Sequence, residues 1–214
     1  MVFVVIASCN LLAICVCGGG MDTDGEGPPI VSRKSLKIGS FIDLAASKRT
    51  RADYTVVATV GIDQVQNVFI LNILRGRWEW PDAYEKIVGE LCDQRVKLVG
   101  VETNGFQLSA FQSLIRDDRV RHIAFNPVPV DDDKTSRSLL VSARGSNGKL
   151  FYQEGAAWAE YMITEFVNFP VFAHDDVVDA VCGAVELLNK FSPRIKAARP
   201  AQVKHTSKWR GGAI

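Results

Sequence analysis

Carboxylates occur at the ends of several apolar segments of this sequence. Asp43 lies inside the apolar run FIDLA, and Glu102 directly follows the run VKLVGV. A third group opens the last apolar helix pattern and consists of Asp175, Asp176 and Asp179. A carboxylate among apolar side chains costs free energy unless a cation or a hydrogen-bond donor pairs with it. These acids are therefore candidates for chemistry.

Strand ends and helix starts meet at one edge of an open α/β sheet, where functional sites form. Three or four carboxylates at such an edge repel one another, and a divalent cation relieves the repulsion. Ligand sets made only of oxygen suit Mg²⁺ or Mn²⁺. Asp176 and Asp179 share a helix face at a spacing of three, and Asp175 and Asp179 do so at a spacing of four. The sequence therefore predicts a metal site that contains Asp43, Glu102 and acids of the last helix.

Structural roles remain open for each of these acids. Acids in a first helical turn complement the helix dipole, which explains one or two of the helix acids but not Asp43. Asp43 could follow a strand as a turn residue, and Glu102 could cap the loop from a strand to a helix. We interpret the run 131–133 as a solvated segment and helix cap, and Asp63, Asp117 and Asp118 as turn residues.

The hydrophobic pattern predicts the elements that position these acids. Strands are expected over Leu36–Leu44, Tyr54–Val60, Val68–Leu74, Val96–Val101, Val120–Phe125 and Leu150–Tyr152. Helices are expected from Pro81 onward and over Phe106–Leu114, Asp133–Ala143, Gly155–Phe166 and Asp175–Phe191. The second and third strands form a hairpin. The order predicts an α/β fold, with a mixed sheet of three antiparallel strands followed by parallel strands and helices on both faces.

The composition is that of an ordinary globular protein. The chain has 214 residues, 47% of them hydrophobic, and a formal net charge of +1. These values exclude a disordered chain and a small disulfide framework. The sequence contains neither a CxxC pair nor a GxxxxGK[ST] motif, so we expect no zinc ribbon and no ATPase domain.

The two ends differ from the body of the chain, which we expect to span residues 30–192. Residues 1–29 hold an apolar run and a glycine-rich linker. The run has the length of a signal-peptide core, although a start at Met21 or a buried strand would also explain it. Residues 193–214 form a basic tail: from residue 190 onward there are seven Lys and Arg residues and no acid. Such a tail is either solvated or in contact with nucleic acid.

Four segments together resemble the C-terminal nuclease domain of the large terminase subunit of tailed bacteriophages. They are FIDLAASKRTRADYTVVATVG, VGVETNGFQ, DDDKTSRSLLVSARGSNGKLFY and FPVFAHDDVVDAVCGAVELL, and the resemblance covers about residues 37–188. That family has a ribonuclease H-like fold and cuts concatemeric DNA during genome packaging with two divalent metal ions. The resemblance implies that Asp43, Glu102, Asp176 and Asp179 are the catalytic metal ligands, with Asp53 and Asp175 as weaker candidates.

The resemblance also implies how the chain meets its substrate. Lys134 and Arg137, in the segment DKTSR, match a pair that can neutralise a DNA phosphate, and His174 is a weaker candidate. A solvated helix start and a helix cap are the structural alternatives. The implied cofactors are two Mg²⁺ or Mn²⁺ ions. The implied partners are double-stranded DNA, an ATPase motor, a small terminase subunit and a portal, in the bacterial cytoplasm and without a membrane.

Large terminase subunits normally carry an N-terminal ATPase motor, which this sequence lacks. We therefore expect a separately encoded nuclease half, a fragment of a prophage gene or a split gene. Two other functions share the same acids or the same fold. One is another ribonuclease H-like nuclease, such as a Holliday-junction resolvase or a transposase. The other is a decayed, non-catalytic module for DNA binding or assembly.

Overall fold

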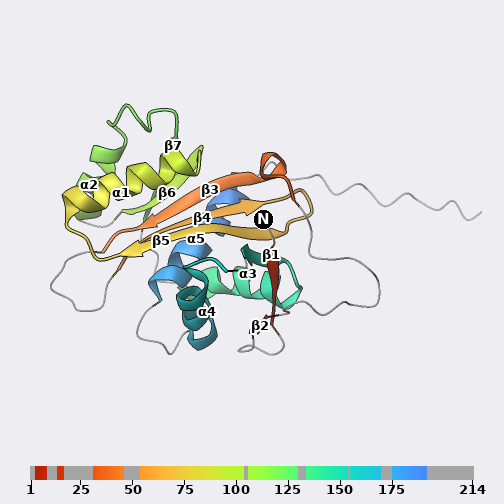
Figure 1. The fold of residues 1–214 in the computed structure, drawn as a ribbon. Helices are drawn as coiled ribbons and strands as arrows, with labels where there is room; N and C mark the ends of the chain where they lie inside the picture. Colours follow the sequence, from red (N-terminus) through yellow and green to blue (C-terminus); the bar gives the residue numbers. More distant parts are fainter. Residues whose placement is uncertain are drawn as a thin grey trace, which may run out of the picture.

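The computed structural model describes most of the body of the chain and two short segments near its start. The described residues are 3–8, 14–16, 31–45, 54–103, 106–129, 134–153, 155–169 and 175–191, with backbone alone at 3–8, 14–16, 106 and 134–137. These ranges form an eight-stranded sheet with helices on both faces (Figure 1). The fold is therefore the α/β class that the pattern of elements predicts.

The sheet has the strand order β2-β1-β8-β5-β4-β3-β6-β7. The strands are β1 (Phe3–Ser8), β2 (Ile14–Val16), β3 (Lys37–Asp43), β4 (Thr55–Ile62), β5 (Val68–Gly76), β6 (Leu98–Thr103), β7 (Ala124–Pro129) and β8 (Leu150–Gln153). Strands β3, β4 and β5 are antiparallel, whereas β6 joins β3, β7 joins β6 and β8 joins β5 in parallel. This arrangement confirms the predicted mixed sheet. Strand β1, which belongs to the apolar run at the start of the sequence, pairs antiparallel with β8 and extends the sheet.

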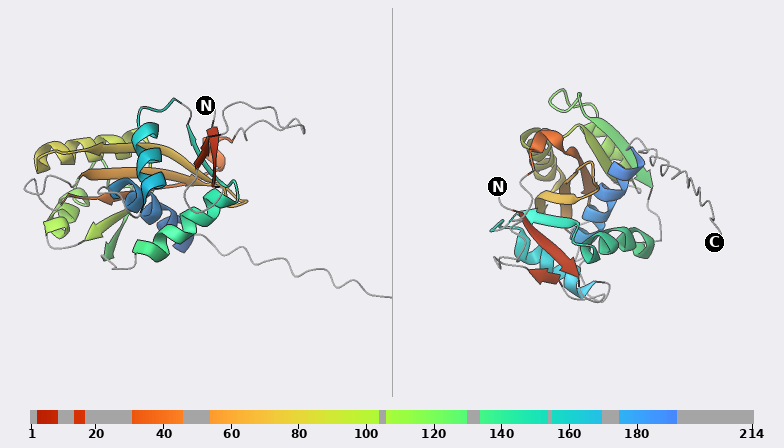
Figure 2. Two further views of the ribbon diagram at one scale, coloured as in Figure 1. Left: turned by 90° about the horizontal axis from the view of Figure 1, so that it is seen from below. Right: turned by 90° about the vertical axis from the view of Figure 1, so that its right-hand side faces the viewer.

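Two helical layers cover the sheet. One face carries α1 (Trp80–Asp93) and α2 (Phe106–Leu114), and the other carries α3 (Lys134–Ser146), α4 (Ala159–Asn168) and α5 (Asp176–Lys190), as Figures 1 and 2 show. Successive residues of a strand point to opposite faces, so β3 contributes to both cores. None of the helices in the described ranges is long and apolar enough to cross a membrane.

Helix α5 lies directly on β3 and runs antiparallel to it. At one end, Lys37 Nζ donates a hydrogen bond to the carbonyl of Phe191, just beyond the last turn of α5. In the middle, the ring of Phe41 is so close to Gly183 and Gly100 that a Cβ at either glycine would lie 2.7 Å from it. The two glycines therefore let α5 approach the sheet closely. The first turn of α5 consequently lies near Asp43, the last residue of β3.

Two of the predicted elements were wrong in position. The strand expected at Val120–Phe125 is β7, which begins at Ala124, while Val120 lies in a turn and is still buried. The apolar side chains of residues 120–123 are therefore buried in the turn that precedes β7. Strand β7 contains Pro127 and Pro129, which an edge strand tolerates because its outer N–H groups need no partner strand.

The helix expected from residue 155 is α4, which begins at Ala159. Gly155 has φ of +72°, in the left-handed region that a right-handed helix excludes. Residues 156–158 then turn before the helix starts. The smaller correction at α1 is that the helix begins at Trp80, one residue before Pro81, and the proline occupies a first-turn position that needs no N–H donor.

Candidate metal centre at the end of strand β3

The register of the central strands places Asp43 next to Glu102. Strands β3 and β6 are parallel, with Ile42 opposite Val101, and the next residues along both strands are Asp43 and Glu102. Both side chains point to the α5 face, because Ile42 and Val101 belong to the core on the opposite face. The two carboxylates thus come from neighbouring strand ends, as the sequence pattern predicts.

Helix α5 brings two further carboxylates to this place. Asp176 and Asp179 lie in its first turn, and Gly183, which contacts Phe41, is one turn beyond Asp179. Residues three and four apart share a helix face, so the two acids project toward the strand that carries Phe41 and Asp43. The charges of both aspartates act on Asp43, which shows that they lie within electrostatic range of it.

The electrostatics of Asp43 reflect this crowding of acids. Burial is the largest cause that raises the pKa of Asp43 well above its usual value of 3.8. The charge of Glu102, a hydrogen bond with Glu102 and the charges of Asp176 and Asp179 raise it further. Burial and the neighbouring acids therefore favour the protonated form of Asp43 over its ionised form. A cation among these groups would reverse the effect, because it favours the ionised form of every acid around it.

The donor set fits a hard divalent cation by its chemistry. Carboxylate oxygens from two strand ends and one helix turn are the ligands that Mg²⁺ and Mn²⁺ prefer. Within the described ranges, however, no three His, Cys, Asp or Glu side chains are placed closely enough to enclose an ion. The four carboxylates therefore lie in one region of the fold, but they do not form a closed ligand set.

The other predicted site residues are placed less completely. Asp175 directly precedes α5 and is partly exposed. Lys134 and Arg137 lie in the first turns of α3, but their side chains fall outside the described part of the chain. Asp53 and His174 lie wholly outside the described residues. Their roles therefore stay predictions.

A buried ion pair next to the candidate ligands was not predicted. The Glu165 side chain, 1% exposed in α4, accepts a hydrogen bond of 2.9 Å from the backbone N–H of Val177 at Oε2. Its Oε1 lies 3.0 Å from Nη2 of Arg75 in β5. Burial raises the pKa of Glu165 to about 7, although the Val177 N–H and Arg75 oppose this shift. In the sequence, the only sign of this ion pair is a glutamate on the buried face of α4. Its partner, Arg75, is 90 residues away.

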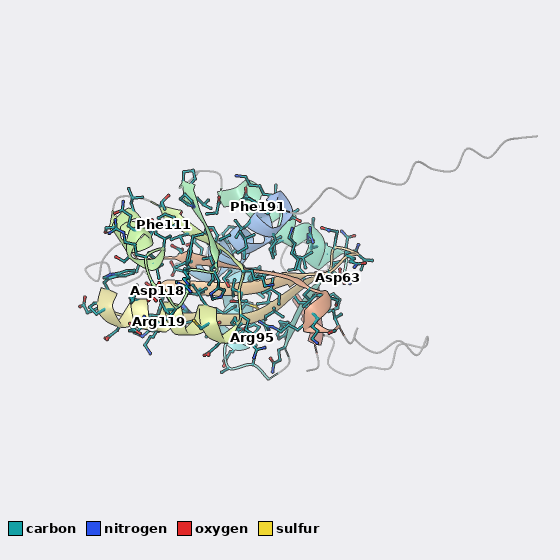
Figure 3. All side chains as sticks on the ribbon, turned by 90° about the horizontal axis from the view of Figure 1, so that it is seen from above. Asp63, Arg95, Phe111, Asp118, Arg119 and Phe191 are labelled. Carbon is teal, nitrogen blue, oxygen red and sulfur yellow. The ribbon has the colours of Figure 1, made fainter. Side chains whose placement is uncertain are left out.

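Another ionic cluster lies on the opposite face and has a structural explanation. Arg119, labelled in Figure 3, pairs with Glu85 of α1 at 2.8 Å and with Asp117 at 2.7 Å. The Arg119 guanidinium holds the pKa of Asp117 well below its usual range. Side chains of Arg119 and Glu85 are 49% and 62% exposed, so the pair contributes little to stability. Asp117 thus fixes a turn, as its position in the sequence predicts.

The pairing of β3 with β4 and β6, covered by α5, defines a ribonuclease H-like fold. The chain belongs to the terminase RNase H-like domain family, whose model matches residues 40–188. The nuclease domain of human cytomegalovirus terminase, solved Mn-soaked with an inhibitor bound, has the same fold: its TM-score is 0.55 at 17% identity, over 72% of this chain and 85% of that one. The structure of Thermus thermophilus RuvC also matches, with a TM-score of 0.42 and 12% identity over 70% of this chain and 94% of that one. No curated protein sequence matches this chain. The resemblance to terminase nuclease domains is therefore confirmed.

Proposed function

We propose that the chain is a metal-dependent DNA endonuclease, the nuclease part of a phage or prophage terminase that cuts concatemeric DNA during packaging. One observation carries this proposal: the register of β3 and β6 and the first turn of α5 bring Asp43, Glu102, Asp176 and Asp179 together at the end of β3, and the charges of the other three raise the pKa of Asp43. A group of partly buried acids that repel one another has no evident structural purpose. It does have a use as a ligand set for cations.

Each acid has a distinct role in this proposal. Asp43 and Glu102, on neighbouring strands, supply the rigid half of the ligand set. Asp176 and Asp179, on α5, supply the half whose position depends on how the helix packs. When bound, two Mg²⁺ or Mn²⁺ ions supply Lewis acidity and positive charge for phosphodiester hydrolysis. The reaction adds water to phosphorus and breaks the bond to the 3′ oxygen, which leaves a 3′-hydroxyl and a 5′-phosphate.

Basic residues outside the acid group supply contacts to the DNA backbone in this proposal. Lys134 and Arg137 at the start of α3 hold a phosphate, and the basic tail adds affinity that does not depend on sequence. Contacts to phosphates carry no sequence information, so we expect weak sequence preference. An ATPase motor, a small terminase subunit and a portal are the proposed partners, and the bacterial cytoplasm is the proposed location.

A nicking assay on supercoiled plasmid tests the activity. We expect the full chain to produce nicked and linear DNA with Mn²⁺ or Mg²⁺ and to stop when EDTA is added. A four-way junction offered beside a duplex of equal length tests the substrate class. Preferential, symmetric cleavage of the junction would replace the proposal with a resolvase. Metal binding without cleavage of either DNA would indicate a decayed module.

A further inference from the structure

The first turn of α5 is held by a side chain from a different helix. The residue before the helix, Asp175, makes no capping hydrogen bond with its side chain. Instead, Glu165 of α4 accepts the N–H of Val177. The first N–H groups of a helix have no partner within the helix, so an outside acceptor fixes where the first turn lies. Asp176 and Asp179 belong to that turn.

Arg75 fixes the Glu165 carboxylate in turn. Its guanidinium pairs with Glu165 at 3.0 Å, lies 3.8 Å from the ring centre of Tyr54, and lies 5.0 Å from that of Tyr161. Tyr161 is held by a hydrogen bond of 3.2 Å from its hydroxyl to the carbonyl of Ile73. With 12% of its side chain exposed, Arg75 is therefore confined by two rings and one carboxylate.

The sheet register connects this pair to the candidate metal centre. Val56 is the register partner of both Asp43 and Arg75, so the two residues lie in one row on the same face. Two strand spacings put their backbones about 10 Å apart. Glu165 and Arg75 thus lie beside the acid group, and Glu165 touches the backbone between the two ligand-bearing positions of α5.

We propose that Glu165 and Arg75 are positioning residues for the metal centre: together they hold the first turn of α5 so that Asp176 and Asp179 can share a metal ion with Asp43 and Glu102. This inference rests on the proposed function, because it takes these four acids as the ligands. Residues that orient metal ligands without touching the metal typically affect affinity by about 10- to 100-fold.

An effect of charge alone and an effect of positioning predict different changes in cation binding when the pair is substituted. Replacing Glu165 with Gln removes a negative charge and weakens cation binding in either case. Replacing Arg75 with Gln removes a positive charge, which by charge alone strengthens cation binding or leaves it unchanged. If the pair acts by position, Arg75→Gln instead weakens binding, because the carboxylate that holds Val177 is no longer fixed.

The experiment is a calorimetric titration of Mn²⁺ into the full chain without DNA. We expect both Glu165→Gln and Arg75→Gln to raise the Kd for Mn²⁺ about 10-fold. Glu90→Gln is the matched control: Glu90 is buried against the opposite face, where it accepts a 2.7 Å hydrogen bond from Asn72 of the same strand β5. We expect this control to keep the Mn²⁺ affinity of the parent, because it removes a negative charge on the other face of the sheet.

Three results would overturn the inference. Mn²⁺ binding by Arg75→Gln that is as tight as, or tighter than, that of the parent would show that the pair acts through charge only. An equal loss of affinity in Glu90→Gln would show that the effect does not depend on where the pair lies. No Mn²⁺ binding by the parent itself would remove the proposed function together with the inference. If Glu165→Gln does not fold, Arg75→Lys decides: it keeps the charge but loses the planar fork, and we expect weaker Mn²⁺ binding.

Discussion

Gly183 of α5 lies directly over the ring of Phe41 of β3, and a Cβ on Gly183 would stand 2.7 Å from ring carbon Cδ2. Phe41 and Asp43 are two residues apart on one strand face, and Gly183 and Asp179 are one turn apart on one helix face. This contact therefore sets the distance between the two halves of the candidate metal centre.

A methyl group at Gly183 should accordingly affect both stability and metal binding. We expect Gly183→Ala to force α5 away from β3 and to cost about 1–3 kcal/mol of unfolding free energy. Mn²⁺ affinity should fall with it, because Asp176 and Asp179 move with the helix. Urea unfolding and Mn²⁺ titration measure the two effects. Gly89→Ala in α1 is the control, since nothing lies within 4 Å of a Cβ there, and it should be neutral or stabilising. Unchanged stability and affinity in Gly183→Ala would contradict this packing.

The stability of the metal-free protein should fall as pH rises from 5.5 to 7.5. The pKa of Glu165 is raised to about 7, and burial also raises the pKa values of Asp43 and Glu90, so the folded state binds more protons than the unfolded state in this range. Stability then decreases with rising pH. The lowered pKa of Glu85 acts in the opposite direction only below about pH 4.5.

Urea unfolding in EDTA at the two pH values measures this dependence. Glu165→Gln should reduce the difference, because it removes one of the groups whose pKa is raised, and Mn²⁺ at pH 7.5 should restore stability to the parent. Greater stability at pH 7.5 than at pH 5.5 in EDTA would refute the assignment of raised pKa values.

The basic tail should contribute affinity for DNA but no chemistry. Seven Lys and Arg residues without an acid lie at or beyond residue 190. We expect removal of residues 194–214 to weaken duplex binding and to flatten its dependence on salt, since fewer counterions are released. Fluorescence anisotropy over a series of salt concentrations measures both quantities. Identical affinity and salt slope in the shortened chain would show that the tail does not contact DNA.

The candidate ligands could be found in the sequence because each acid marks an element end. Asp43 interrupts an apolar strand and Glu102 follows one, and strand ends on one sheet edge converge in any open α/β fold. The helix Asp176–Lys190 was also predictable, since its apolar positions repeat at helical spacing.

Features that depend on tertiary contacts were not predictable. The buried pair of Glu165 and Arg75 joins α4 to β5, and no local sequence pattern indicates a contact between residues 90 positions apart. Strand β7 was placed too early because the apolar residues before it are buried in a turn, and its two prolines are acceptable only because it lies at the sheet edge. The pairing of β1 with β8 likewise joins residues more than 140 positions apart.

The most direct test of the metal centre is Mn²⁺-dependent plasmid nicking by Asp43→Asn. The amide keeps the shape of the side chain and removes the charge, so the variant should fold and, in EDTA at pH 7.5, be at least as stable as the parent. Nicking should fall by orders of magnitude, because a metal ligand is lost, and the stabilisation by Mn²⁺ should shrink. Asp118→Asn is the control, because that side chain is 94% exposed on the opposite face, and it should behave like the parent (Figure 3). Nicking by Asp43→Asn at the rate of the parent, with Mn²⁺ still required, would contradict the account.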